Sequence, residues 1–307
     1  MPEPVIIDCD PGHDDAMALL LALASPELEL VAVTTVAGNQ TLDKVTANAI
    51  RVLDLAHATH VPVAAGADRA LIHPAAVARD VHGETGLDGP DLPRPSRQPR
   101  PQHAVELIAD KLRERPLTLI AIGPLTNVAL LLATHPELTP RIERIVVMGG
   151  AIGLGNVTPS AEFNIWADPE AAARVFASGL DLTLVGLDVT HRAMLSAERA
   201  EGLRASGRAG AVVADLHAFY RRFHERVYGH SDTPVHDAVT IAHLIDPALL
   251  ATRRLPVEID VTNGPCRGRT VVDLLQRTGA APNAHVAVDV DAQRFIDLLT
   301  TRIASLG

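Results

Sequence analysis

The chain has 307 residues, of which 47% are hydrophobic, and its 27 basic and 37 acidic residues give a formal charge of −10 at pH 7. That charge repels phosphate backbones and anionic lipids, which argues against nucleic acid and membrane as partners, and no apolar run reaches the roughly 20 residues that span a bilayer. The two cysteines and the absence of a signal-peptide pattern predict a cytoplasmic protein, and we expect one domain over residues 1–307.

Apolar runs rich in Val and Ile alternate with segments of helical spacing over the first 187 residues. The predicted strands are 5–7, 28–36, 61–65, 117–122, 142–148 and 180–187, and the predicted helices are 16–24, 41–58, 104–113, 125–133 and 169–177. Such alternation indicates an α/β fold of Rossmann-like type, with a mainly parallel central sheet and helices on both faces. In such a fold the active site lies at the carboxyl ends of the strands.

The second part of the chain is less regular. It predicts a helical region at 196–227, a helix at 237–244, strands near 255–261 and 286–290, and a terminal helix at 292–303. The segment 90–101 contains five prolines, which remove backbone donors and fix φ, so we expect an exposed loop there.

Four carboxylates, Asp8, Asp10, Asp14 and Asp15, lie within eight residues after the first predicted strand. One or two could cap the following helix, but four anions at this spacing repel one another unless a cation neutralises them. Oxygen ligands favour Ca²⁺ or Mg²⁺ over zinc, and a site that also accepts a backbone carbonyl and substrate hydroxyls suits the higher coordination number of Ca²⁺. The alternative is a purely structural acidic cluster.

The other predicted strands also end in polar turns. Glycine and oxygen-bearing side chains combine in 37–39 and 123–127, and a glycine pair follows Met148. Glycine permits close approach of the backbone to a ligand, so these turns predict a single site for a hydroxyl-rich ligand or a hard cation.

The run Asp8-Cys9-Asp10-Pro11-Gly12-His13-Asp14-Asp15-Ala16 resembles the amino-terminal signature of the inosine-uridine preferring nucleoside hydrolase family, which usually has Thr in place of Cys9. The likeness continues in order through Val36-Ala37-Gly38-Asn39, Val81-His82-Gly83, Gly123-Pro124-Leu125-Thr126-Asn127, Met148-Gly149-Gly150, Glu162-Phe163-Asn164-Ile165 and Pro234-Val235-His236-Asp237. It therefore covers most of the chain. We expect Cys9, on the other face of the strand, to change packing rather than function.

The resemblance implies hydrolysis of the N-glycosidic bond of ribonucleosides, giving ribose and a free base. Ca²⁺ would be held by Asp10, Asp15, Asp237 and the carbonyl of Thr126, and Asp10 would also be the general base for the attacking water. The transition state would be oxocarbenium-like. The matching ribose-binding positions are Asp14, Asn39, Asn156, Glu162 and Asn164, and Met148 would form a wall of the pocket.

Two of the 14 histidines match family positions near the leaving base. His236 precedes a proposed metal ligand, and we expect it to protonate, hydrogen-bond or position the leaving base. His82 lies near the base on a loop whose glycines permit closure. Both are candidate catalytic residues, and which of them acts on the leaving group does not follow from the sequence. The remaining histidines are interpreted as surface or core residues. On the base side, Phe163 lies in a motif, and Tyr220, His224 and Tyr228 recur at helical spacing, although which base is preferred does not follow from them.

Two other functions remain in view. A strand that ends in Asp-x-Asp also occurs in haloacid-dehalogenase-type phosphatases, but these use a lysine at a later strand end, and here Lys44 and Lys111, the only lysines, fall within predicted helices. A non-catalytic nucleoside-binding protein would keep the pocket without the chemistry, and the intact metal set argues against it. The expected partner is a small ribonucleoside, and family resemblance implies a homodimer or homotetramer.

Overall fold

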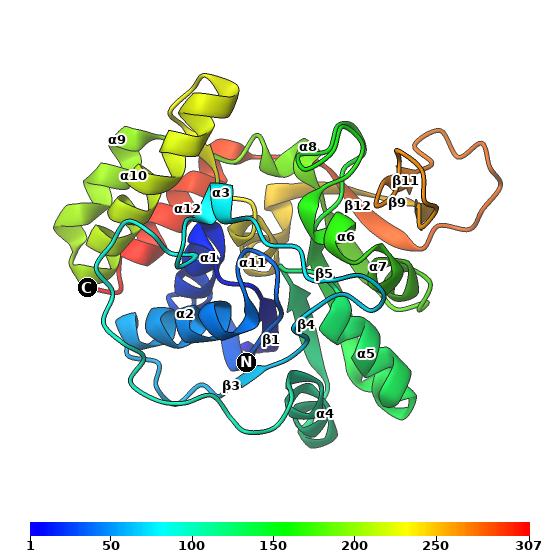
Figure 1. The fold of residues 1–307 in the computed structure, drawn as a ribbon, viewed down its shortest axis with the longest axis horizontal. Helices are drawn as coiled ribbons and strands as arrows, with labels where there is room; N and C mark the ends of the chain where they lie inside the picture. The colour runs from blue at the N-terminus through cyan, green and yellow to red at the C-terminus, as the bar shows by residue number, and fades with distance from the viewer.

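The computed structural model describes residues 1–307 and is built on one eight-stranded sheet (Figure 1). The strand order is β3-β2-β1-β4-β5-β6-β12-β9, and every neighbouring pair is parallel except β12 with β9. The strands are β1 (Glu3–Cys9), β2 (Leu28–Thr35), β3 (Val63–Ala65), β4 (Leu117–Ala121), β5 (Ile142–Met148), β6 (Leu182–Val185), β9 (Leu250–Leu255) and β12 (Ala284–Val290). This confirms the predicted α/β class.

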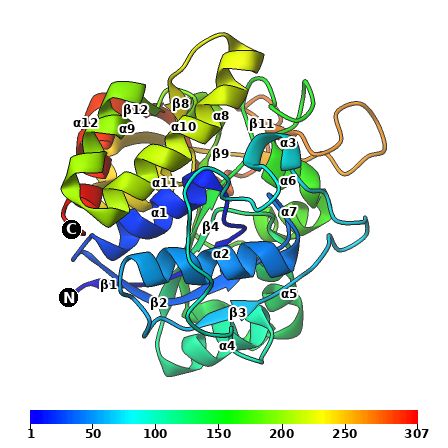
Figure 2. The same ribbon diagram turned by 60° about the vertical axis from the view of Figure 1, so that its left-hand side comes forward.

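Helices cover both faces of the sheet because the side chains of a strand alternate between the faces. Val5, Ile7 and Cys9 of β1 belong to one hydrophobic cluster, whereas Ile6 belongs to the other. The first cluster packs under α1 (His13–Leu23), α2 (Leu42–Leu55), α9 (Ala197–Gly202), α10 (Arg208–Tyr228), α11 (Ala238–Ile245) and α12 (Ala292–Ala304). The second packs under α4 (Ala104–Glu114), α5 (Thr126–Thr134) and α7 (Pro169–Phe176) (Figure 2).

Short elements connect these layers. They are α3 (Arg79–His82), α6 (Phe163–Ala167), α8 (Leu187–Thr190), the 3₁₀ turns η1 (Pro136–Arg141), η2 (Leu203–Ser206) and η3 (Pro247–Leu249), and the two-strand pairs β7 (Met194–Leu195) with β8 (Thr233–Pro234) and β10 (Val257–Ile259) with β11 (Thr270–Val272). No helix is both long enough and apolar enough to cross a bilayer.

Two predictions for the second part of the chain need correction. The strand expected near 255–261 divides: β9 ends at Leu255 in the central sheet, and β10 pairs with β11 outside it. The helical region expected at 196–227 is interrupted at Gly207, whose φ of +122° lies outside the helical region and favours glycine. The proline-rich segment 90–101 has no helix or long strand, as expected.

Candidate active site

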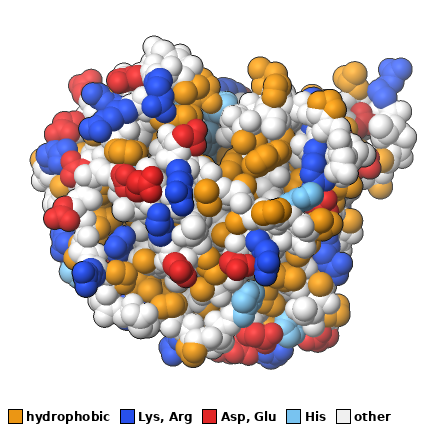
Figure 3. Space-filling view, in the orientation of Figure 1, with side chains coloured by type: hydrophobic (Ala, Val, Ile, Leu, Met, Phe, Trp, Pro, Cys, Tyr) orange, Lys and Arg blue, Asp and Glu red, His pale blue; other side chains and the backbone are white.

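A cavity of about 440 Å³ opens at the carboxyl ends of the central strands. In the space-filling view it appears as a hollow between the side of α10 and the side of α8, with histidine visible inside it (Figure 3). Of the 15 residues predicted for the site, 12 line this cavity: Asp14, Asn39, His82, Met148, Asn156, Glu162, Phe163, Asn164, Tyr220, Tyr228, His236 and Asp237. The other three, Asp10, Asp15 and Thr126, are buried and are not among the lining residues.

The floor of the cavity is acidic. One carboxylate oxygen from each of Asp14, Asp15 and Asp237 lies within 4.8 Å of the others, and all three residues are buried. Asp14 and Asp15 occupy the first turn of α1, where the helix dipole favours anions, and Asp237 is the N-cap residue of α11. Burial raises the pKa of Asp14 to about 7 and that of Asp15 to about 6, and burial together with the neighbouring carboxylates raises the pKa of Asp237.

Asp10 lies beside this group, between two glycines. Its Oδ2 accepts a 2.7 Å hydrogen bond from the backbone N–H of Asn39, whereas its Oδ1 is buried without a partner. A Cβ atom at Gly38 would lie 2.1 Å from Oδ2, and one at Gly123 would lie 2.6 Å from Oδ1. Both glycines are therefore required for the carboxylate to fit. A buried carboxylate oxygen without a hydrogen-bond donor suits a cation, and this all-oxygen donor set fits a hard divalent ion.

Asp8 has a different environment from the other three carboxylates of the motif. Its Oδ1 accepts hydrogen bonds from Thr34 Oγ1 at 2.6 Å and Asn127 Nδ2 at 2.8 Å. Its Oδ2 is buried without a partner, and burial raises its pKa to about 6. The hydrogen bonds from Thr34 and Asn127 join β1 to β2 and α5.

Thr126 begins α5, and its side chain is held by Asp168. Thr126 Oγ1 donates to Asp168 Oδ2 at 2.7 Å, and the same oxygen accepts the backbone N–H of Leu71 at 2.9 Å. Asp168 Oδ1 accepts the N–H of Ala171 at 3.1 Å and so caps α7. One fully buried carboxylate thus joins three chain segments, a role that the sequence analysis did not assign to it.

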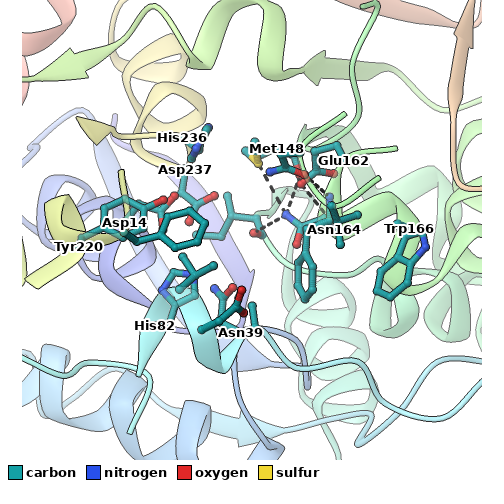
Figure 4. Close-up of a pocket in the computed structure, with 18 of the residues that line it drawn as sticks. Asp14, Asn39, His82, Met148, Glu162, Asn164, Trp166, Tyr220, His236 and Asp237 are labelled. Atoms are coloured by element: carbon teal, nitrogen blue, oxygen red, sulfur yellow. Dashed lines mark hydrogen bonds between the residues drawn. The ribbon is translucent and has the colours of Figure 1, made fainter. Parts of the chain in front are cut away.

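The side of the cavity opposite Asp14 and Tyr220 carries the polar side chains expected to bind a sugar (Figure 4). Glu162 caps α6 and accepts the backbone N–H groups of Gly150 at 2.8 Å, Asn164 at 3.0 Å and Ile165 at 3.2 Å. Its pKa is nevertheless raised to about 7, because burial outweighs these hydrogen bonds. Asn164 Nδ2 donates to the carbonyl of Met148 at 3.2 Å, which fixes the amide at the cavity wall.

Asn39 and Asn156 are also held in place by the backbone or by a neighbouring carboxylate. Asn39 Nδ2 donates to Asp15 Oδ2 at 2.9 Å, and Asn156 Oδ1 accepts the N–H of Phe163 at 3.0 Å. The walls therefore present preorganised donors and acceptors, the combination that recognises a polyol.

Histidine and aromatic side chains line the cavity opposite this sugar-binding side. Tyr220, His224 and Tyr228 of α10 lie along it, and the His224 ring is 4.5 Å from the Tyr220 ring and 5.4 Å from the Tyr228 ring. His236 Nδ1 lies 2.7 Å from Thr190 Oγ1, which orients the ring. Burial lowers the pKa of both His236 and His82, so both rings are neutral at physiological pH.

Two histidines at or beside the site were interpreted from sequence as ordinary surface or core residues. His191 lines the cavity, with its ring 5.4 Å from that of His236. His13 is fully buried behind His82, and their Nδ1 atoms are 3.1 Å apart. The signal for His13 was its place inside the acidic motif. His191 follows the short helix α8 and carried no comparable signal.

Comparison with known proteins identifies the class of enzyme that this fold and site define. The sequence model of the inosine-uridine preferring nucleoside hydrolases matches residues 5–297. Among solved structures, a plant nucleoside hydrolase superimposes with a TM-score of 0.94 at 34% identity, covering 99% of this chain and 100% of that one. A purine-preferring ribonucleoside hydrolase from Gardnerella vaginalis gives a TM-score of 0.93 at 34% identity, covering 99% of both chains.

The chain belongs to the inosine-uridine preferring nucleoside hydrolase family and is a nucleoside hydrolase. Within the family it is similar to proteins named pyrimidine-specific ribonucleoside hydrolase RihA. The protein of that name from Citrobacter koseri is 52% identical over 305 residues, which are 98% of each chain. The one from Shewanella sp. (strain ANA-3) is 52% identical over 308 residues, covering 99% of this chain and 97% of that protein.

Proposed function

We propose that this enzyme hydrolyses pyrimidine ribonucleosides to ribose and the free base, with Ca²⁺ bound at the acidic floor of the cavity. The observation that carries the proposal is the unpartnered Oδ1 of Asp10 beside the clustered oxygens of Asp14, Asp15 and Asp237. The preference for pyrimidines is supported by the names of the relatives at 52% identity, which resemble this chain more closely than the purine-preferring enzyme at 34%.

In this proposal Asp10, Asp15, Asp237 and the carbonyl of Thr126 hold the cation. When bound, Ca²⁺ would lower the pKa of a coordinated water and bind two hydroxyls of the ribose. Asp14 belongs to the same oxygen cluster, so it accepts a hydrogen bond from a sugar hydroxyl close to the ion rather than at a distance from it.

In this mechanism different side chains of the cavity activate the water, stabilise the developing charge and hold the sugar. Asp10 accepts the proton of the attacking water as the water oxygen bonds to C1′, and the electrons of the C1′–N bond leave with the base. The buried carboxylates stabilise the positive charge that develops on the sugar. Glu162 and Asn164 hold the sugar hydroxyls so that C1′ faces the water.

The leaving base needs a proton or a hydrogen bond. His236 is oriented by Thr190, and His82 lies beside Tyr220 near Asn39 (Figure 4). Both rings are accessible from the cavity, so they are the groups that can contact the base as the bond breaks. Tyr228 and Phe163 contribute apolar surface to either side of the substrate.

The test is release of ribose from uridine, cytidine, inosine, adenosine and guanosine, with Ca²⁺ present, after chelation, and with Ca²⁺ or Mg²⁺ added back. We expect release from the two pyrimidine nucleosides only with Ca²⁺, and loss of turnover in Asp10→Ala with little change in fold. Asp43→Ala, at an exposed position in α2, is the matched control. Release in chelator, or wild-type kcat in Asp10→Ala, would contradict the proposed mechanism.

The cytoplasmic location and the homo-oligomeric state remain predictions. Gel filtration with light scattering measures the second directly, and a monomer at micromolar concentration would contradict it.

A further inference from the structure

The turn that follows β5 supplies one of the hydrogen bonds that hold Glu162. Gly150 has a φ of +67°, in the left-handed region that favours glycine, and its N–H donates to Glu162 Oε2 at 2.8 Å. Oε2 also accepts the N–H of Ile165 at 3.2 Å, whereas Oε1 accepts one bond, from the N–H of Asn164 at 3.0 Å. Because a carboxylate oxygen has two lone pairs, Oε1 keeps one for a sugar hydroxyl. The direction of that lone pair depends on the position of Gly150.

The next peptide group of the turn is held at both ends. The carbonyl of Gly150 accepts the N–H of Leu187 at 2.9 Å, and the N–H of Ala151 donates to Thr270 Oγ1 at 2.8 Å. Thr270 is buried, with 2% of its surface exposed. A Cβ atom at Gly150 would lie 2.4 Å from the same Oγ1, so the hydroxyl rests directly against the turn.

Thr270 is part of the β10–β11 hairpin, which lies outside the central sheet beside α7 (Figure 1). Thr270 pairs with Ile259, which is buried in the hydrophobic cluster under α7. Nη2 of Arg267 donates to both carboxylate oxygens of Glu170 in α7, at 2.7 and 2.8 Å, and both side chains are largely buried. The hairpin is therefore firmly attached to the body of the enzyme.

The same hairpin also packs on the helix that begins at Glu162. A Cβ atom at Gly268 would lie 2.8 Å from the Cα atom of Trp166, so the backbone of the hairpin lies against the backbone of α6. The carboxylate of Glu162 joins the turn at Gly150 to α6, and the hairpin contacts both segments from behind.

We propose that Thr270 is a positioning residue for Glu162. By accepting the N–H of Ala151 it fixes the turn after β5, and the N–H of Gly150 in that turn orients the carboxylate that binds the ribose. Thr270 is not among the residues that line the cavity, so it acts through Glu162 rather than on the substrate. This inference rests on the sugar-binding role proposed above for Glu162.

Thr270→Val removes the acceptor and keeps the branched shape of the side chain. Valine puts a methyl group in place of the hydroxyl that lies 2.8 Å from the Ala151 nitrogen. Because non-bonded carbon needs about 3.5 Å, the turn is pushed back by roughly 0.7 Å, and the buried N–H of Ala151 loses its partner. Thr270→Ala removes the hydroxyl without the added methyl group, and Thr270→Ser keeps the hydroxyl.

The first measurement is hydrogen exchange of the backbone amides in the Ca²⁺-loaded enzyme, followed by NMR and expressed relative to the amides of β5. We expect Ala151 and Gly150 to exchange at least about tenfold faster in Thr270→Val and Thr270→Ala than in the wild type, and within about twofold of it in Thr270→Ser. Gly150 decides the matter, because its N–H binds Glu162 and not Thr270. Unchanged exchange at Gly150 in both variants would overturn the proposal.

The second measurement is kcat/KM for uridine and for 4-nitrophenyl β-D-ribofuranoside, each divided by the folded fraction. The two substrates share the ribose and differ in the leaving group. We expect Thr270→Val to lower both values about tenfold, and Thr270→Ser to recover most of the loss. A loss on uridine alone would place the effect at the leaving base, and no rescue by serine would show that the hydroxyl is not responsible; either result would overturn the proposal.

Two control variants separate positioning from general destabilisation. Ile259→Val removes a methylene group from the buried side of the same hairpin and leaves the Thr270 hydroxyl in place. Thr252→Val makes the same chemical change at an exposed position of β9. Both should match the wild type within about twofold in Gly150 exchange and in kcat/KM, and a tenfold loss in Ile259→Val would overturn the proposal. If the wild type releases no ribose from any nucleoside, the proposed function fails, while the exchange of Gly150 still decides whether Thr270 sets the partner of Glu162.

Discussion

Replacing Gly38 with alanine places a methyl group against the proposed catalytic carboxylate. The Cβ atom would lie 2.1 Å from Asp10 Oδ2, about 1.3 Å short of the 3.4 Å at which ordinary contacts begin. The carboxylate cannot simply turn aside, because the same Cβ would lie 2.9 Å from Pro124 Cδ and Gly123 lies close to Oδ1. Asp10 must therefore move by about 1 Å, or Gly38 must move away from it.

A displacement of about 1 Å at a reacting group costs roughly 100-fold in rate, about 2.7 kcal/mol of transition-state stabilisation. We expect this loss in kcat for uridine in Gly38→Ala, and a smaller loss in Gly123→Ala, whose Cβ would lie 2.6 Å from Oδ1. Ribose release is measured with saturating Ca²⁺, and circular dichroism gives the folded fraction by which each rate is divided.

The control is Gly202→Ala, since a Cβ atom there meets nothing within 4 Å and its φ is negative. The reasoning is refuted if folded Gly38→Ala turns over uridine within twofold of Gly202→Ala. It is also refuted if Gly123→Ala loses more activity than Gly38→Ala, because the order follows from the two distances.

Three further predictions concern charge and binding. Burial raises the pKa of Glu162 from 4.5 to about 7, so the folded state binds a proton that the unfolded state releases, and stability is lost as pH rises through this window. Urea titrations in the presence of a Ca²⁺ chelator measure the free energy of unfolding of the wild type and of Glu162→Gln. The difference between the two should fall by about 3 kcal/mol from pH 4.5 to pH 8. A difference that does not change with pH would contradict this prediction. Ca²⁺ at 100 times its Kd should stabilise the wild type and Asp8→Asn by about 2.7 kcal/mol but leave Asp15→Asn unchanged, and equal stabilisation of all three would exclude Asp15 as a ligand. Tyr228 is half-exposed in the wall of the cavity. Tyr228→Ala should raise KM for uridine and leave kcat unchanged, because it removes binding that substrate and transition state share. A lower kcat at unchanged KM would contradict this role of Tyr228.

The sequence predicted the central strands well because strands buried on both faces appear as continuous apolar runs. It failed at β9, whose sequence LATRRL has exposed residues throughout its middle. This strand forms the edge of the sheet, and its pairing with β12 rather than its own composition determines its place. The short helices α3 and α6 are also outside the reach of periodicity, because one turn contains no repeat to detect.

The site was predicted to the extent that motifs mark strand ends. The alternation of strand residues predicts that Asp8 and Asp10 share a face, but it cannot tell what each carboxylate contacts. The contacts of Asp8 depend on Thr34 and Asn127, which are 26 and 119 positions away and donate hydrogen bonds to it directly. Likewise His13 contacts the carbonyl of Asp88, which is 75 positions away, and no local pattern reports such a contact.

The Asp168 carboxylate couples an exposed loop to the helix that supplies a proposed metal ligand. It ties the backbone at Leu71, next to an exposed loop, to Thr126 and to the first turn of α7. In the proposed mechanism the carbonyl of Thr126 holds Ca²⁺, so a displacement of Leu71, which breaks a hydrogen bond on the oxygen that also restrains Thr126, would weaken retention of the ion. An Asp168→Asn enzyme would therefore release Ca²⁺ faster than the wild type.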